Sequence, residues 1–286
     1  MKNIIVFGSN GMLGSYLCIY LSTLFHEFKQ NKQNKYNVIG VSREKFEVTN
    51  DNITHLKSFL EDFNFTNNTI VINCIGLIPQ RNKTNDNSLY FLVNTIFPLA
   101  LEKACQKLNF RLLHASTDCV FSGSKNYGEK YNETELPDEE NIYGLSKYLG
   151  EPLQSTVIRS SIIGEEIYNK LSFLEWVKTS KETINGFNNH YWNGVTCLQY
   201  AKIVDQIISE NLFWQGVRHL HSPSVVSKYD LCCIINNVYN CDLTIVPDNT
   251  PTIINKTLDT IYTLNKVFDI PCIEEQIKEQ SEFKLI

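Results

Sequence analysis

The sequence predicts an α/β fold in which a doubly wound parallel sheet carries a smaller C-terminal lobe. Two observations predict this class. Short, continuous apolar runs alternate with longer segments of helical periodicity through the first half of the chain, as is typical of a parallel sheet covered on both faces. Beyond Arg159 this alternation stops, which indicates a separate lobe.

The predicted elements of the first half follow from these runs. The first strand is the Ile-Ile-Val-Phe run at 4–7, which Gly8 ends. Residues 69–74 are rich in the β-branched side chains that strands favour, and residues 87–107 carry apolar side chains at helical spacing. The other predicted strands are 37–41, 111–115 and 156–159, and the other predicted helices are 12–28, 53–63 and 143–151.

The second half is predicted to contain helices at 171–181 and 198–211 and a strand at 217–220. Ser227 is a typical N-cap for a helix that runs to residue 239. Residues 185–195 are aromatic, rich in asparagine and without periodicity, so we predict a functional loop there. We divide the chain into a sheet domain, 1–164, and a lobe, 165–286, in which 197–221 packs back on the sheet.

Composition and charge exclude several classes of protein. The chain has 286 residues, of which 43% are hydrophobic and 20% charged, as is usual for a globular protein. Its 26 basic and 31 acidic residues give a net charge of −5, which argues against a nucleic-acid partner. No apolar run approaches the roughly 18 residues of a membrane helix. Nine cysteines without a Cys-x-x-Cys pair indicate reduced thiols and no metal site, so we expect a cytoplasmic protein.

A glycine-rich turn follows the first predicted strand and opens the first predicted helix. Glycines at such a junction let the backbone approach a pyrophosphate, whose charge the helix N-terminus stabilises. The sequence therefore predicts a Rossmann-type dinucleotide site. Its expected residues are Gly8, Asn10, Gly11, Met12, Leu13 and Gly14. The Gly-x-x-Gly-x-x-Gly spacing resembles that of the extended short-chain dehydrogenase/reductase superfamily.

The end of the second predicted strand indicates which nicotinamide cofactor is used. Enzymes specific for NAD place an acidic side chain here to hold a ribose hydroxyl, whereas this chain has Ser42 and Arg43. A hydroxyl and a guanidinium suit a 2′-phosphate, which favours NADPH over NADH. The resemblance to the superfamily further implies that Cys74, Ile75 and Gly76, after the third strand, line the cofactor site.

Tyr143 and Lys147 form a Tyr-x-x-x-Lys motif, which places both side chains on one helix face. Tyr262 and Lys266 form a second match without the same surroundings, and we assign it a structural role. A ketone reductase needs a proton donor. A phenol has an ordinary pKa of about 10 and acts as an acid or base near neutral pH when a neighbouring cation, here Lys147, stabilises the phenolate. Thr117 would orient the same carbonyl oxygen by a hydrogen bond.

Three longer stretches resemble the dTDP-4-dehydrorhamnose reductase family. They are Ser-Thr-Asp-Cys-Val-Phe-Ser-Gly at 116–123, Tyr-Gly-Leu-Ser-Lys-Tyr-Leu-Gly-Glu at 143–151 and Arg-Ser-Ser at 159–161. The resemblance implies an NADPH-dependent oxidoreductase that reduces the 4-keto group of a nucleotide-linked 4-keto-6-deoxyhexose, in deoxysugar and polysaccharide biosynthesis. Residues 1–164 would bind NADP(H) and residues 165–286 the nucleotide-diphosphate-sugar. The superfamily's habit also implies a homodimer.

The substrate side of the site is expected to use Cys119, Trp192 and Asn193. Trp192 could stack on a sugar or base ring. The stretch at 186–196 resembles a polysaccharide-pathway branch of the family, which implies a UDP-2-acetamido-2,6-dideoxyhexos-4-ulose as substrate beside dTDP- or UDP-4-keto-rhamnose. Cys119 replaces a tyrosine of the rhamnose enzymes, and Ile162 replaces an aromatic residue near their sugar, so dTDP-4-dehydrorhamnose itself fits less well.

Two alternatives remain open. Cys119 lies two residues after Thr117, the offset at which GDP-fucose synthase-like enzymes carry an epimerising cysteine. The protein could therefore be a bifunctional 3,5-epimerase/4-reductase whose second acid–base group is Lys178, Lys181 or His190, although a small core residue is the simpler interpretation of Cys119. The other alternative is a non-catalytic redox sensor that binds NADP(H), but such modules commonly lose the tyrosine or the lysine.

Overall fold

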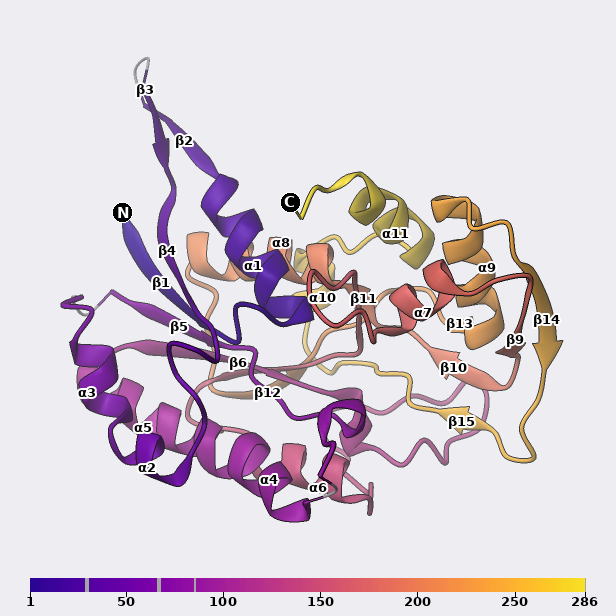
Figure 1. Cartoon of the computed structure of the whole chain (residues 1–286), viewed down its shortest axis with the longest axis horizontal. Helices are drawn as coiled ribbons and strands as arrows, with labels where there is room; N and C mark the ends of the chain where they lie inside the picture. The colour runs from indigo at the N-terminus through magenta and orange to yellow at the C-terminus, as the bar shows by residue number, and fades with distance from the viewer. Residues whose placement is uncertain (29–30, 66–67, 85, 286) are drawn as a thin grey trace.

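The computed structural model describes residues 1–28, 31–65, 68–84 and 86–285. Its centre is a six-stranded sheet with the strand order β12-β7-β6-β5-β1-β4, and every neighbouring pair is parallel. The strands are β1 (Lys2–Phe7), β4 (Tyr36–Val41), β5 (Ile70–Asn73), β6 (Arg111–Ser116), β7 (Thr156–Arg159) and β12 (Gly216–His219). This architecture confirms the predicted α/β class (Figure 1).

The strand order reverses at β1, because β4 pairs with one edge of β1 and β5 with the other. Chain connections leave such a reversal point in opposite directions, which opens a crevice beyond the carboxyl ends of the two strands. Gly8 follows β1 and Cys74 follows β5, so the predicted cofactor residues begin at this crevice.

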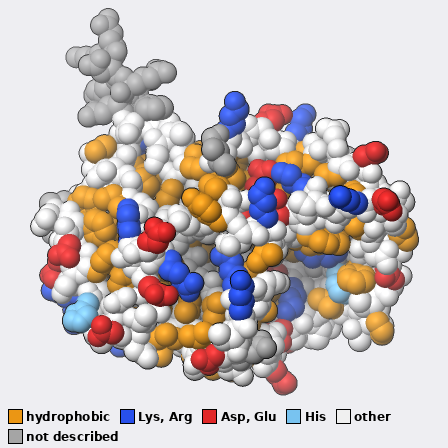
Figure 2. Space-filling model, in the orientation of Figure 1, with side chains coloured by type: hydrophobic (Ala, Val, Ile, Leu, Met, Phe, Trp, Pro, Cys, Tyr) orange, Lys and Arg blue, Asp and Glu red, His pale blue; other side chains and the backbone are white. Residues whose placement is uncertain are grey.

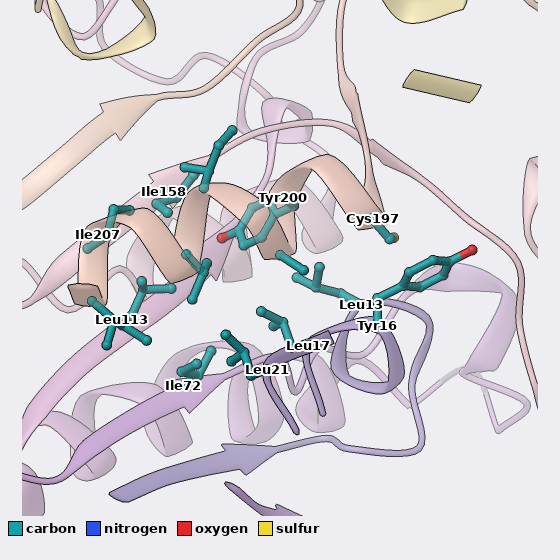
Figure 3. Packing of buried hydrophobic residues seen from close by; sticks show 14 of the residues in the cluster. Leu13, Tyr16, Leu17, Leu21, Ile72, Leu113, Ile158, Cys197, Tyr200 and Ile207 are labelled. Atoms are coloured by element: carbon teal, nitrogen blue, oxygen red, sulfur yellow. The ribbon is translucent and has the colours of Figure 1, made fainter. Parts of the chain in front are cut away.

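Helices cover both faces of the sheet. On one face, α1 (Met12–Thr23) and α8 (Cys197–Ser209) pack against each other and the strands. Figure 3 shows side chains of α1, among them Leu17 and Leu21, between α8 and the strand that carries Ile72. On the other face, α3 (Leu56–Glu61) and α5 (Phe97–Leu108) bury Leu60 and Leu101 against the sheet. The sheet is therefore buried from both sides.

The C-terminal lobe has its own apolar core, to which Leu174, Trp192, Leu231, Ile235 and Ile277 belong. Its helices are α7 (Phe173–Thr179), α9 (Lys228–Tyr239) and α11 (Ile273–Glu282). Its strands are β9 (Thr183–Phe187), β10 (His190–Trp192), β13 (Val226–Ser227), β14 (Thr244–Asp248) and β15 (Ile254–Asn255). The short pair β8 (Ile162–Ile163) and β11 (Val195–Thr196) joins the lobe to the end of the sheet.

The remaining elements are short. They are β2 (Phe25–Phe28), β3 (Asn31–Asn34), α2 (Asn50–Thr54), the 3-10 helices η1 (Pro79–Arg81) and η3 (Asp118–Val120), α4 (Asn87–Phe91), the π-helix η2 (Leu92–Ile96), α6 (Ile142–Leu149) and α10 (Leu264–Val267). The helix predicted at 53–63 is thus divided between α2 and α3, and the helix predicted at 87–107 passes through a π-helical turn.

Two sequence-based predictions were wrong. The helix predicted at 12–28 ends at Thr23, because Leu24 is extended and the chain turns into the antiparallel hairpin β2–β3. The segment 185–195 is not a loop but contributes to β9, β10 and β11. Its strands pair with β14, with β13 and β15, and with β8. Their partners lie far away in the sequence, so local composition gave no sign of them.

Helix α8 and the strand β12 that follows it pack against the sheet domain. Helix α8 packs on α1, and β12 adds the last strand beside β7. The division of the chain at residue 164 stays a prediction.

Within the described residues, no helix is both long and apolar enough to cross a membrane. Figure 2 shows that the face in view carries basic and acidic side chains interspersed.

Candidate active site

A cleft of about 340 Å³ opens at the carboxyl end of the sheet, between the strand ends and the C-terminal lobe. It is lined by residues at the start of α1, in the loops after β5 and β6, on α6 and in the segment 160–173. Of the predicted site residues, the lining includes Gly11, Met12, Leu13, Cys74, Ile75, Gly76, Thr117, Cys119, Tyr143 and Lys147. The cleft therefore brings together side chains from the predicted cofactor, catalytic and substrate groups.

The glycine-rich turn fits a dinucleotide pyrophosphate. A Cβ atom at Gly14 would stand 2.1 Å from the carbonyl oxygen of Gly8, and one at Gly8, whose φ is +79°, would stand 3.1 Å from the backbone at Cys74. Only glycine permits this close approach of three segments. Helix α1 begins next to it, and Gly11, Met12 and Leu13 at its N-terminus line the cleft. The helix N-terminus therefore faces the cleft as a site for negative charge.

Five predicted cofactor residues lie beside the cleft rather than in its lining: Gly8, Asn10, Gly14, Ser42 and Arg43. The amide of Gly8 donates to the carbonyl of Val41, at the end of β4, over 2.9 Å. Ser42 and Arg43 thus follow the strand that lies next to the glycine-rich turn. The side chain of Arg43 is 82% exposed and only weakly tied to Glu47, at 3.6 Å, so its guanidinium is free to bind an anion there.

Lys147 is buried at the floor of the cleft. Its Nζ donates to the carbonyl oxygen of Ala115, at the end of β6, over 3.0 Å. Burial lowers the pKa of Lys147 to about 8, against the opposing effect of the Glu151 carboxylate. That carboxylate is fixed in turn by Arg159, at 2.7 Å, and by the hydroxyl of Ser116, at 2.6 Å. The Ala115 carbonyl therefore holds the lysine in place, and the buried carboxylate of Glu151 favours its charged form.

Tyr143 lies one helical turn before Lys147 on α6, whose N-cap Asn141 accepts a hydrogen bond from the amide of Gly144. Burial raises the pKa of Tyr143, while a side-chain hydrogen bond with Thr117 lowers it. The phenol is thus held in its protonated form, but a raised pKa makes it a weaker acid than a group whose pKa lies near neutral. The predicted lowering of the Tyr143 pKa by Lys147 is not seen in this structure, where burial has the larger effect.

Thr117 caps the short helix η3. Its Oγ1 accepts from the amide of Cys119 over 3.1 Å and donates to Asp118 over 3.2 Å. The hydroxyl lies beside Tyr143, with which it also interacts. If it turns its proton away from Asp118, the hydroxyls of Thr117 and Tyr143 can both bind a single carbonyl oxygen in this cleft, which is the arrangement that a ketone reduction needs.

The thiol of Cys119 is less suited to acid–base chemistry. Burial raises its pKa to about 12, and the carboxylate of Asp118 acts in the same direction. The three residues suggested as its partner lie outside the cleft lining. Lys178 forms an ion pair with Glu165, and His190 hydrogen-bonds Thr250 at 2.8 Å. The epimerase alternative thus gains no support from these groups.

Trp192 and Asn193 do not reach the cleft. Trp192 is 5% exposed and belongs to the apolar core of the lobe. The side-chain amide of Asn193 makes two hydrogen bonds to the backbone of Leu258, at 2.7 and 2.9 Å. These side chains build the lobe, and their predicted direct contact with substrate has no support from their position. Polar and aromatic composition alone did not distinguish a structural strand from a binding loop.

Sequence reasoning missed several residues of the lining. Arg81 and Glu166 form an ion pair of 2.5 Å across the cleft, and the carboxylate of Glu166 also accepts from the amide of Ser172 at 3.1 Å. Phe173, at the start of α7, adds an apolar surface. These residues lie in stretches without any motif, so no local signal could have found them. Among the described residues, no group of three or more potential ligands could hold a metal ion.

Several known proteins are similar to this chain over most of its length. The chain is 26% identical over 275 residues to the spore coat polysaccharide biosynthesis protein SpsK of Bacillus subtilis, covering 92% of this chain and 89% of that protein. It is 24% identical over 246 residues to a dTDP-4-dehydrorhamnose reductase of Aggregatibacter actinomycetemcomitans, covering 82% and 78%. A crystal structure of dTDP-4-dehydrorhamnose reductase from Bacillus anthracis in complex with NADP superimposes with a TM-score of 0.79, at 20% identity, over 98% and 99% of the two chains.

At that identity the structural likeness shows a shared fold. The family itself is shown by a family model, described as the RmlD substrate binding domain, which matches residues 1–256. Since this match spans most of the chain and includes both the glycine-rich turn and the Tyr143–Lys147 helix, the chain belongs to the RmlD substrate binding domain family.

Proposed function

We propose that this protein is an NADPH-dependent reductase of the 4-keto group of a nucleotide-linked 4-keto-6-deoxyhexose. The observation that carries the proposal is the meeting of Thr117, Tyr143 and Lys147 in one cleft with the glycine-rich turn. The family and its relatives named as dTDP-4-dehydrorhamnose reductases support the same reaction class. The exposed guanidinium of Arg43 beside that turn supports NADPH over NADH.

The roles of the residues follow from their chemistry. NADPH, when bound, supplies the hydride for the ketone carbon. Tyr143 gives its proton to the oxygen that becomes the alcohol, and Thr117 donates a hydrogen bond that orients this oxygen. Lys147 holds the nicotinamide ribose, and its ammonium stabilises the phenolate that Tyr143 becomes. Because all three groups are retained, turnover is favoured over a redox sensor without catalysis.

The substrate is proposed to be a UDP- or dTDP-linked sugar whose product enters polysaccharide synthesis, in line with the name of the SpsK relative. The test follows nicotinamide absorbance after the enzyme is mixed with UDP- and dTDP-linked 4-keto-6-deoxyhexoses, with and without a 2-acetamido group. NADPH and NADH are compared in parallel. Oxidation of NADPH that requires one of these sugars supports the proposal. Tight NADPH binding without oxidation on any of them would contradict it.

A further inference from the structure

Lys228 is a cation at the lobe side of the cleft that the proposed reaction has not used. It is the first residue of α9, and Ser227 fixes its position through a capping box with Asp230, in which the amide of Asp230 donates to Ser227 at 3.0 Å. The Lys228 ammonium lies 4.8 Å from the ring centre of Phe173 and 5.2 Å from that of Trp192. Phe173 lines the cleft, so the Lys228 ammonium lies beside the cleft, over the face of this ring, although Lys228 is not itself part of the lining.

The other cations around the cleft already have partners. Arg81 pairs with Glu166 at 2.5 Å, Lys256 with Glu139 at 2.8 Å, and Lys147 donates to Ala115. Within the parts of the chain that the structure describes, Lys228 has neither a hydrogen bond nor an ion pair, and its electrostatic neighbours include Asp118 and Cys119 of the cleft lining. Its charge is therefore left without a direct counter-ion.

A cation in this state costs stability. Burial lowers the pKa of Lys228, because the low-dielectric surroundings disfavour its charged form. Contact with two aromatic rings and attraction to the Asp118 carboxylate compensate only in part. Proteins keep such a group where function needs it, since binding sites are commonly less stable than an apolar alternative would be. An anion that enters the cleft would supply the missing partner.

We propose that Lys228 binds the diphosphate of the nucleotide-linked sugar, an inference that rests on the proposed function for its substrate class. The ring of a 4-keto-6-deoxyhexose is uncharged, so the diphosphate is the only anion that such a substrate brings. The pyrophosphate of the cofactor has its own site at the glycine-rich turn and the N-terminus of α1. A second diphosphate needs a second positive group, and a lysine ammonium is a suitable point charge for phosphate.

The test measures binding of UDP and dTDP by calorimetry to the full-length protein and to Lys228→Met, which keeps the apolar stem of the side chain. Loss of a charge-assisted hydrogen bond should weaken binding of the preferred diphosphate about ten- to hundredfold. Wild-type binding should also weaken more with added salt than binding to the variant. Lys278→Met, which removes an exposed lysine of the same lobe, is the matched control and should bind like wild type, and all three proteins should bind NADPH equally.

Thermal unfolding separates this role from a purely structural one. Removing an unpaired ammonium should leave the Tm of the ligand-free protein unchanged or raise it. If the lysine serves only to pack on Phe173 and Trp192, Lys228→Met lowers the Tm and leaves diphosphate binding unchanged, and the proposal is overturned. It is also overturned if wild type binds neither UDP nor dTDP. Lys228→Gln repeats the comparison should the first variant be poorly folded.

Failure of this inference is distinguishable from failure of the proposed function. Reduction of a 4-keto sugar with diphosphate binding that does not depend on Lys228 would remove only the role of this lysine. Diphosphate binding that depends on Lys228, without reduction of any 4-keto sugar, would keep the anion site and remove the reductase.

Discussion

The two walls of the cleft are built in different ways. The sheet wall consists of the residues at the strand ends and on α6, among them Thr117, Tyr143 and Lys147. Each follows a strand or lies on the next helix, so the local sequence positions it. The lobe wall consists of 160–173, with the Lys228 ammonium against the ring of Phe173. Its parts are held by distant partners, such as Glu166 by Arg81, 85 residues away. In the proposed function, the reaction chemistry lies on the wall with local signals, and the proposed recognition of the substrate lies on the wall assembled by long-range contacts.

The largest expected effect is a loss of turnover when the hydroxyl of Tyr143 is removed from the sheet wall, with the fold unchanged. Tyr143→Phe removes the proton donor and should lower kcat about 10²- to 10⁴-fold. NADPH affinity should stay within about twofold and thermal stability should hardly change, because the phenyl ring keeps its place near Tyr90. Steady-state kinetics, cofactor titration and thermal unfolding measure the three quantities.

Tyr262→Phe is the matched control for this experiment. Tyr262 also stands four residues before a lysine, but it is 39% exposed and lies outside the cleft lining. Its variant should keep wild-type kcat. If Tyr143→Phe retained wild-type turnover, or if both variants lost it equally, the assignment of the proton donor would be wrong.

In the lobe the expected effect is on stability instead. Trp192→Ala removes a large side chain that is 5% exposed from the lobe core, and should lower the free energy of unfolding by about 3–5 kcal/mol. Denaturant unfolding measures it, and the surviving folded enzyme should keep kcat within about threefold. Trp176→Ala, at a tryptophan that is 43% exposed, should cost much less. A collapse of kcat without a loss of stability in Trp192→Ala would show that Trp192 acts on the substrate after all.

The same contrast explains how far the sequence could predict this molecule. The glycine-rich turn and the Tyr143–Lys147 motif carry their geometry within a few residues, so the strand ends, the helix starts and the gathering of these residues at one cleft were predictable. The strands at 183–196 depend on pairing with 226–227, 244–248 and 254–255, which composition does not reveal. The positions of Arg81, Glu166 and Lys228 at the cleft depend on contacts between segments that are far apart in the sequence, so no local pattern predicts them.

The pH dependence of the reaction sharpens the description of the sheet wall. Because the pKa of Lys147 is lowered to about 8 in the ligand-free cleft, its ammonium is present below this pH and is lost above it. We therefore expect kcat/KM for reduction to be flat at lower pH and to fall about tenfold per pH unit well above pH 8. A profile of kcat/KM from pH 6 to about pH 10 measures this, with thermal unfolding across the same range as a control for denaturation. A profile that stays flat up to pH 10 would contradict this role of the ammonium.

The smallest expected effect concerns Cys119, which lies on η3 beside Thr117 and lines the cleft. A thiol whose pKa is raised to about 12 stays protonated near neutral pH, so it cannot readily remove a proton from the sugar. Cys119→Ser should change kcat less than about threefold. The wild-type reaction run in deuterated water should then place no deuterium at C3 or C5 of the product, as mass spectrometry would show. Incorporation at either carbon that disappears in Cys119→Ser would instead establish the bifunctional epimerase and reductase. Part of the reaction would then depend on Cys119 and not on the residues of α6.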